Sequence, residues 1–89
     1  MKGIITVLGK DKVGIIARVC VYLSDSGVNI LDISQTIVQG YFNMMMIVDF
    51  AQSPLKFEDA AEGLEKLGNE IGVRIQLQHE DIFNSMHRI

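Results

Sequence analysis

The sequence lacks the features that mark several common functional classes. Its one cysteine, Cys20, cannot form an internal disulfide bond or supply the several thiolates of a soft-metal site. Eight lysines and arginines against eleven aspartates and glutamates give a net charge of -3, whereas nucleic-acid surfaces are usually basic. No apolar run approaches the ~18 residues of a membrane span, and no signal-peptide segment opens the chain. These absences predict a cytoplasmic domain that binds neither a membrane nor, directly, a nucleic acid.

What remains has the composition of one globular domain. The 89 residues are 48% hydrophobic and 21% charged, and no linker or low-complexity segment interrupts them. Residues 81–89 form a C-terminal tail whose apolar side chains have helical spacing. A segment this short is not helical alone, so we expect the tail to pack on the domain or on a partner. The apolar residues of the tail are Ile82, Phe83, Met86 and Ile89.

A strand, a loop and a helix are predicted at the start of the chain. Residues 2–8 are rich in Ile, Thr and Val, with apolar side chains on both faces, which is typical of a central strand. Residues 9–12 form a loop, and the helix runs from about 13 to 25, where Gly27 follows as a natural C′ residue. The predicted buried stripe of this helix is Ile16, Val19, Cys20 and Leu23.

A hairpin is predicted next. Residues 29–39 alternate imperfectly, which indicates a β-bulge near Leu31 and Asp32. Gly40 supplies the turn, and residues 41–50 alternate strictly. Two strands joined by so short a link are antiparallel. On the third strand the predicted core side is Phe42, Met44, Met46, Val48 and Phe50, opposite Tyr41, Asn43, Met45, Ile47 and Asp49.

A second helix and a fourth strand complete the pattern. Ser53 and Pro54 look like an N-cap followed by proline at the first helical position, and Gly72 ends the helix. Residues 73–80 then alternate as a strand. The helix stripe is Phe57, Ala60, Ala61, Leu64, Leu67 and Ile71, with Glu58 and Asp59 early in the helix, where the macrodipole favours acids.

The order β-α-β-β-α-β repeats one β-α-β plan twice. Right-handed crossovers then predict an α+β, ferredoxin-like sandwich: a four-stranded antiparallel sheet with both helices on one face and a short C-terminal helical tail.

Many functions share this topology, so each is judged by its own residues. An RNA-binding sheet needs aromatic rings on an open, basic face, and a small phosphatase needs an arginine in the first loop. The open side of the third strand offers mainly Tyr41, Asn43, Met45, Ile47 and Asp49, which does not favour RNA. The basic residues of the first loop are Lys10 and Lys12, and Arg18 lies more than a turn into the helix, which does not favour a phosphatase. Neither His79, which we expect to be solvated, nor His87 has a metal-ligand partner at a suitable spacing. We therefore expect no enzyme, no metal and no cofactor.

Several segments together resemble the ACT domain, a family of small regulatory modules that typically bind amino acids. They are 9–14 (Gly-Lys-Asp-Lys-Val-Gly), the helix, 27–30 (Gly-Val-Asn-Ile) and 32–36 (Asp-Ile-Ser-Gln-Thr). The last segment and the chain's ending are similar to small stand-alone prokaryotic ACT proteins and to half of the glycine cleavage system repressor. Many relatives have proline where Val13 stands here.

The resemblance implies a homodimer with a ligand at its interface. A helix from 13 to 25 is roughly 18 Å long, so Gly14 and Asn29 lie at opposite ends of one copy. A two-fold dimer that pairs first helices and second strands brings Gly14 of one copy beside Asn29 of the other. Loop N–H groups then hold a carboxylate, while Asp11 and the other copy's Asn29 meet an amino group. The predicted ligand-binding residues are Gly9, Lys10, Asp11, Lys12, Val13, Gly14, Asn29 and Asp32.

Each of these residues also has an ordinary structural explanation. Gly14 could allow close helix packing, Asp11 could shape the turn, Asn29 could support entry into a strand, and Asp32 could be a solvated strand residue. The alternative function is a protein-interaction or transcription-related regulator without a working pocket, which uses the apolar open face of the sheet or the tail.

Overall fold

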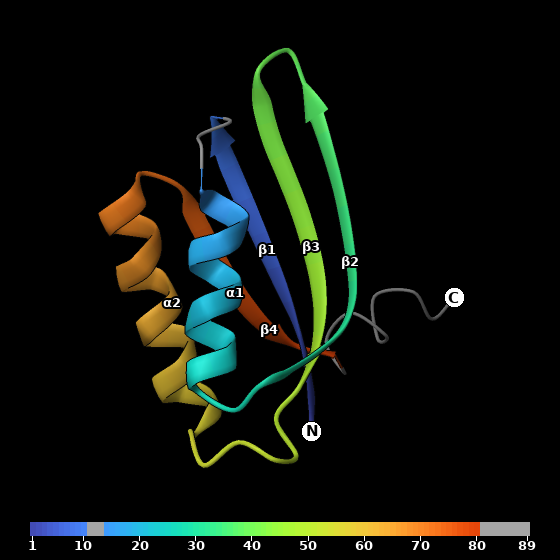
Figure 1. The fold of residues 1–89 in the computed structure, drawn as a ribbon, viewed down its shortest axis with the longest axis vertical. Helices are drawn as coiled ribbons and strands as arrows, with labels where there is room; N and C mark the ends of the chain where they lie inside the picture. Colours follow the sequence, from blue (N-terminus) through green and yellow to red (C-terminus); the bar gives the residue numbers. More distant parts are fainter. Residues whose placement is uncertain (11–13, 81–89) are drawn as a thin grey trace.

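The computed structural model describes residues 1–10 and 14–80, and in it two helices pack on one face of a four-stranded antiparallel sheet (Figure 1). The predicted ferredoxin-like order is confirmed, with β1 central in the strand order β2-β3-β1-β4. The predicted tail, 81–89, lies outside the described residues. The elements are β1 (Lys2–Lys10), α1 (Ile15–Asp25), β2 (Asn29–Val38), β3 (Tyr41–Asp49), α2 (Phe57–Ile71) and β4 (Arg74–His79).

The core lies between the helices and the covered face of the sheet. Along β3 and β4, alternation places every second side chain there, as predicted. No described helix is long and apolar enough to cross a membrane. The largest side chains with no significant exposure are Ile5, Val7, Val19, Leu23, Met44, Met46, Val48 and Leu64.

α1 begins two residues later than predicted, and its buried stripe is shifted. The stripe is Ile15, Val19 and Leu23, while Ile16 is 37% exposed. The prediction was wrong at Ile16 because spacing alone allows either of two neighbouring isoleucines to face the sheet, and the helix start decides between them. Cys20 is half-buried and packs against the core, as expected for a small core residue.

α1 ends as predicted, at a Schellman motif. The N–H of Gly27 donates to the carbonyl of Ser24 at 3.1 Å, and the N–H of Val28 donates to that of Leu23 at 2.9 Å. These two bonds satisfy carbonyls that a helix end leaves free, and they fix the direction in which the chain enters β2.

α2 begins at Phe57 with Lys56 as its N-cap, so the predicted Ser53–Pro54 cap is wrong. The Ser53 hydroxyl instead accepts the N–H of Leu55 at 3.1 Å and donates to the Ser26 carbonyl at 2.6 Å. The serine therefore caps a local turn and ties it to the end of α1, because serine oxygens serve turns as readily as helix starts. Glu58 and Asp59 do lie in the first turn of α2.

β4 ends beside the start of α2, which changes the expected environment of its last residue. His79 is half-buried rather than solvated, and its ring stacks on Phe57 with centroids 3.8 Å apart. Because the end of β4 lies close to the start of α2, His79 has an aromatic partner that the sequence pattern did not indicate.

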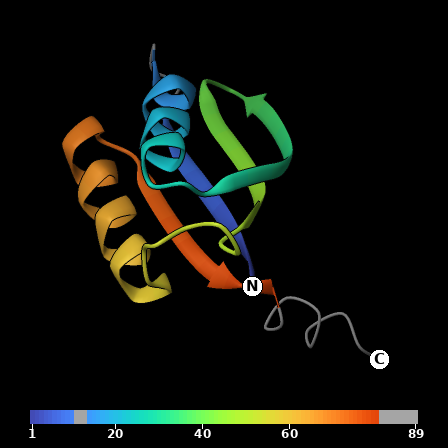
Figure 2. The ribbon, with the colours of Figure 1, turned by 60° about the horizontal axis from the view of Figure 1, so that its bottom comes forward.

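β2 is an edge strand that leans away from the helices (Figures 1 and 2). The predicted bulge is confirmed: the register with β3 shifts between Ile30 and Asp32. Apart from the half-buried Ile30, every residue of β2 is exposed, including four large apolar ones. These are Leu31 (45% exposed), Ile33 (42%), Ile37 (58%) and Val38 (65%).

Candidate functional site

The N-terminal end of α1 is bare. Gly14 is its N-cap, with φ 88° and ψ 1°, and among the described residues no side chain caps this end and no acid lies in its first turn. A left-handed φ suits glycine, and no described residue outside its chain neighbours lies within 4 Å of where a Cβ on Gly14 would stand. The part of the chain that the structure describes therefore gives no support to the close-packing explanation of Gly14. A bare N-terminal end of a helix favours an anion.

Gly9 and Lys10 belong to β1 and not to the loop, which corrects their predicted location. They pair with Phe42 and Tyr41 of β3. A Cβ on Gly9 would lie 2.8 Å from Val73 Cγ1, so the glycine permits the connection before β4 to pass close to β1. The other predicted loop residues, Asp11, Lys12 and Val13, lie outside the described residues.

The C-terminal end of α1 opens into a recess. This hollow has a volume of about 480 Å³ and includes Asn29, which is exposed at the start of β2. The last turn of α1 contains no basic residue, and its final residue is the exposed Asp25. A helix C-terminus with an added carboxylate favours a cation such as an ammonium group. The recess is lined by Ser24, Gly27, Val28, Asn29, Ile30 and Gln52.

Asp32 lies at the bulge rather than in the recess. Its carboxylate accepts the backbone N–H of Ile33 at 2.9 Å, and the residue pairs with Ile47 on the face of the sheet away from the helices. Asp32 therefore has a local backbone partner in addition to its predicted role as a ligand contact.

One copy of the chain keeps the two ends of the site apart. α1 lies between Gly14 and Asn29 in the chain and spans about 16 Å with its eleven residues. Figure 1 shows the helix running along the sheet. The distance is too long for the carboxylate and amino group of a single amino acid. The two predicted contact residues therefore lie too far apart in one copy to hold the same amino acid, as the sequence analysis expected.

The face that would meet a second copy carries apolar side chains. Ile33 and Ile37 pair with Met46 and Phe42, so they lie on the side of the sheet that the helices cover, yet both are exposed. Within the described residues, the outer edge of β2 has no strand partner. An exposed edge with apolar side chains is a ready site for a further strand.

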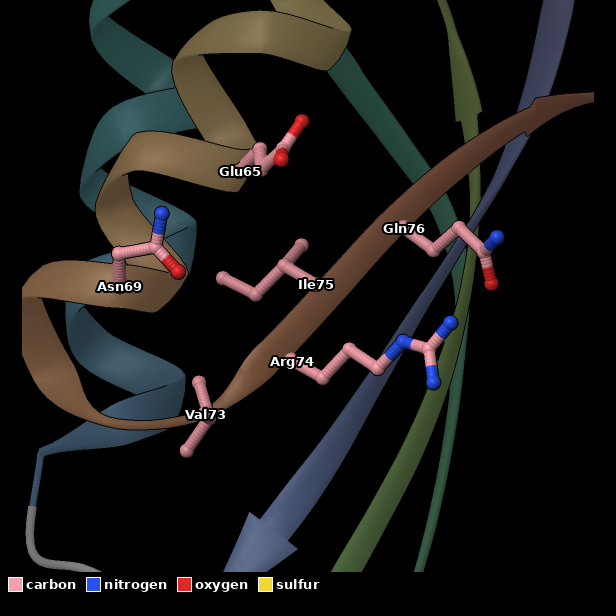
Figure 3. A pocket seen from close by; sticks show the side chains of 6 residues that line it. All are labelled: Glu65, Asn69, Val73, Arg74, Ile75 and Gln76. Atoms are coloured by element: carbon pink, nitrogen blue, oxygen red, sulfur yellow. The ribbon is translucent and has the colours of Figure 1, made fainter.

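A second hollow of about 270 Å³ lies between α2 and β4 (Figure 3). Glu65 and Asn69 border it from the helix, while the Arg74 and Gln76 side chains project away from the helix on the far side of β4. It contains none of the residues that the sequence singled out. No group of three or more metal-ligating side chains occurs in the described parts of the chain.

Sequence reasoning missed Ser24 and Gln52, which share the recess with Asn29. Gln52 follows a strand in a polar segment, and nothing in its local pattern distinguishes it from other surface glutamines. The segment that carries Gln52 lies beside the recess, where the Ser53 hydroxyl donates to the carbonyl of Ser26, 27 residues earlier in the chain.

The β-α-β-β-α-β order and the four-stranded antiparallel sheet are those of a ferredoxin-like domain. The family model for the ACT domain matches residues 3–78, and the chain belongs to that family. The resemblance drawn from the sequence is thereby confirmed.

Two of the similar proteins have about the same length as this chain, and a third is longer. A UPF0237 protein from Bifidobacterium longum is 64% identical over 88 residues, which are 99% of this chain and 98% of the relative. The ACT domain protein from Streptococcus pneumoniae superposes with a TM-score of 0.83 at 42% identity, over 93% of each chain. A protein assigned as a glycine cleavage system transcriptional repressor shares the fold, with a TM-score of 0.76 at 23% identity; the match covers 86% of this chain and 44% of that one.

Proposed function

We propose that this chain is a non-catalytic, cytoplasmic regulatory module that senses a small amino-acid-like ligand as a homodimer. The ligand binds between two copies, with its carboxylate at the Gly14 end of α1 in one copy and its amino group at the Asn29 recess of the other. Binding favours one arrangement of the dimer, and this shift in population is the signal.

The two bare ends of α1 are the observation that carries the proposal. Neither end is neutralised by a described side chain, and Asp25 adds negative charge to the C-terminal end. A helix has partial charges of roughly +0.5 and -0.5 at its ends. When two α1 helices lie antiparallel about a two-fold axis, the positive end of one faces the negative end of the other. An amino-acid zwitterion between these two ends has its carboxylate at the positive end and its ammonium group at the negative end, so both charges are stabilised.

The β2 edge supports the dimer. Ile33 and Ile37 would be covered by a second copy, and the unpaired backbone groups of β2 would bond to β2 of that copy. A two-fold axis makes this surface self-complementary, so no other partner is needed to cover it. Membership of the ACT family favours the same kind of assembly.

Two measurements on the purified protein test the proposal. Sedimentation velocity should give a dimer at micromolar concentration. A thermal-shift screen of the twenty amino acids should raise the Tm with one or a few of them, because a ligand at 100 times its Kd adds about 2.7 kcal/mol. A monomer, or a protein whose Tm is unchanged by all twenty, contradicts the proposal.

A second candidate function rests on the open face of the sheet. Three exposed apolar side chains gather there, Leu8 (50% exposed), Tyr41 (55%) and Met45 (38%), and they favour a protein-binding regulator without a ligand. Under this alternative the amino-acid screen gives no Tm change. Substituting Met45 by aspartate then abolishes capture of a protein partner, while the dimer stays intact.

A further inference from the structure

We propose that Gln52 is a ligand-contacting residue at the Asn29 end of the site and that Ser53 is the residue that positions it. This inference rests on the proposed function and extends it to a segment, 50–55, that the predicted site did not include. The amino group of the bound amino acid donates to the Gln52 side-chain carbonyl.

Gln52 lines one side of the recess and comes from a different segment than the other lining residues. The remaining lining comes from the end of α1, the turn after it and the start of β2, whereas Gln52 comes from the segment after β3. The two segments touch: a Cβ built on Gly27 would lie 3.7 Å from the Gln52 backbone oxygen. Gln52 thus borders the same hollow as Asn29.

The polar groups of this recess are available to a ligand. Within the described residues, the side chains of Ser24, Asn29 and Gln52 make no hydrogen bond or ion pair. All three are uncharged, and the C-terminal end of α1 beside them favours a positive charge. Neutral oxygen acceptors near a helix C-terminus suit an ammonium group, which has three donors to satisfy.

The backbone on both sides of Gln52 is fixed by hydrogen bonds. On one side, the Asp49 carboxylate accepts the N–H of Ala51 at 3.0 Å. On the other, the Ser53 N–H donates to the Phe50 carbonyl at 3.0 Å, and the Ser53 hydroxyl donates to the Ser26 carbonyl at 2.6 Å. The last bond joins the segment to the turn that precedes Asn29. Such preorganisation spares the ligand the cost of ordering the segment.

The test measures affinity by calorimetry, with the amino acid that gives the largest Tm shift in the wild-type screen. Gln52→Ala should weaken binding about tenfold, because a hydrogen bond to a charged group is lost. Gln52→Glu should strengthen binding, because a carboxylate then faces the ammonium group. Gln78→Ala, at an exposed glutamine of β4 that does not line the recess, should bind like the wild type.

Ser53 is tested through its dependence on Gln52. Ser53→Ala should weaken binding, and Ser53→Thr, which keeps a hydroxyl, should restore it. In a Gln52→Ala background the Ser53→Ala change should cause no further loss of affinity, since the serine acts by holding the glutamine. A purely structural role would lower the Tm in both backgrounds and would reduce affinity equally in both.

The outcomes separate this inference from the proposed function. If the wild type binds none of the amino acids, the proposed function and the Gln52 inference are both overturned. If it binds one of them and Gln52→Ala binds equally well, the proposed function stands and the Gln52 contact is overturned. Weaker binding by Gln52→Glu overturns the pairing of Gln52 with the amino group. Additive losses for Gln52 and Ser53 overturn the positioning role.

Discussion

At the scale of single residues, Gly14 has two properties that a ligand site at a helix start requires. Its φ of 88° lies in the left-handed region, and no described residue outside its chain neighbours lies within 4 Å of where a Cβ would stand. Leucine at position 14 would conflict with both properties. A side chain occupies the space, and a left-handed conformation costs about 1–2 kcal/mol for an L-residue.

We therefore expect Gly14→Leu to lower the Tm by several degrees, at ~4–8 °C per kcal/mol for a domain of this size, and to abolish binding of the amino acid. The matched control is Gly40→Leu. Gly40 also has a positive φ, 81°, and open space around it, but it lies in the turn between β2 and β3. Calorimetry should give a similar loss of stability in the control with unchanged affinity. Equal affinity in both variants would remove Gly14 from the site.

Residues also differ in how far the sequence predicts them. The positions of Gly14 before α1 and of Asn29 at the start of β2 were predicted from local pattern, because both flank a recognisable helix. Gly9 was assigned to the loop, although it lies in β1 and is glycine because Val73 passes close to it. Gln52 was missed, because its place depends on a hydrogen bond between Ser53 and Ser26. A contact between residues 27 positions apart does not affect local periodicity, so the sequence pattern does not reveal it.

At the scale of elements, β2 is the least covered strand of the sheet and the surface on which the proposed dimer depends. Ile33→Lys and Ile37→Lys each place a charge on the helix-side face of this edge, where a second copy would bury it. We expect sedimentation velocity to show a dimer dissociation constant at least tenfold higher for each variant. The monomer fold should lose little stability, since both side chains are already exposed.

Leu8→Lys is the control for these variants. Leu8 is 50% exposed and lies on β1, where its neighbours Asn43 and Arg74 are on the open face of the sheet. A charge there leaves the β2 edge untouched, so the dimer should persist. Dissociation caused by Leu8→Lys and not by Ile33→Lys would mean that the copies associate through their open faces.

Elements were predicted unequally well. The strands, the bulge and the end of α1 follow the sequence closely, because alternation and a C′ glycine act over a few neighbouring residues. The predicted starts of both helices were too early: the observed N-caps are Gly14 for α1 and Lys56 for α2. Neither start has a side-chain cap that the sequence could have indicated, and the Ser53 hydroxyl, the predicted cap of α2, bonds to Leu55 and Ser26 instead.

At the scale of the whole molecule, stability and assembly are linked. If the dimer is the folded form that binds ligand, mass action makes the Tm rise with protein concentration. We expect the wild-type Tm to increase over a hundredfold range of concentration, as measured by calorimetry, and that of Ile33→Lys to stay constant over the lower part of this range. A wild-type Tm that does not change with concentration would indicate that folding does not depend on association.

The site divided between two copies is the central claim, and complementation tests it most directly. Gly14→Leu and Asn29→Ala chains should each form dimers that bind no amino acid. Coexpressed and purified as mixed dimers, they should recover one site, built from the intact Gly14 of one chain and the intact Asn29 of the other. Titration calorimetry should then give one ligand per mixed dimer, against two for the wild type. Mixed dimers that bind no ligand, while the wild type binds two, would contradict a site shared between chains.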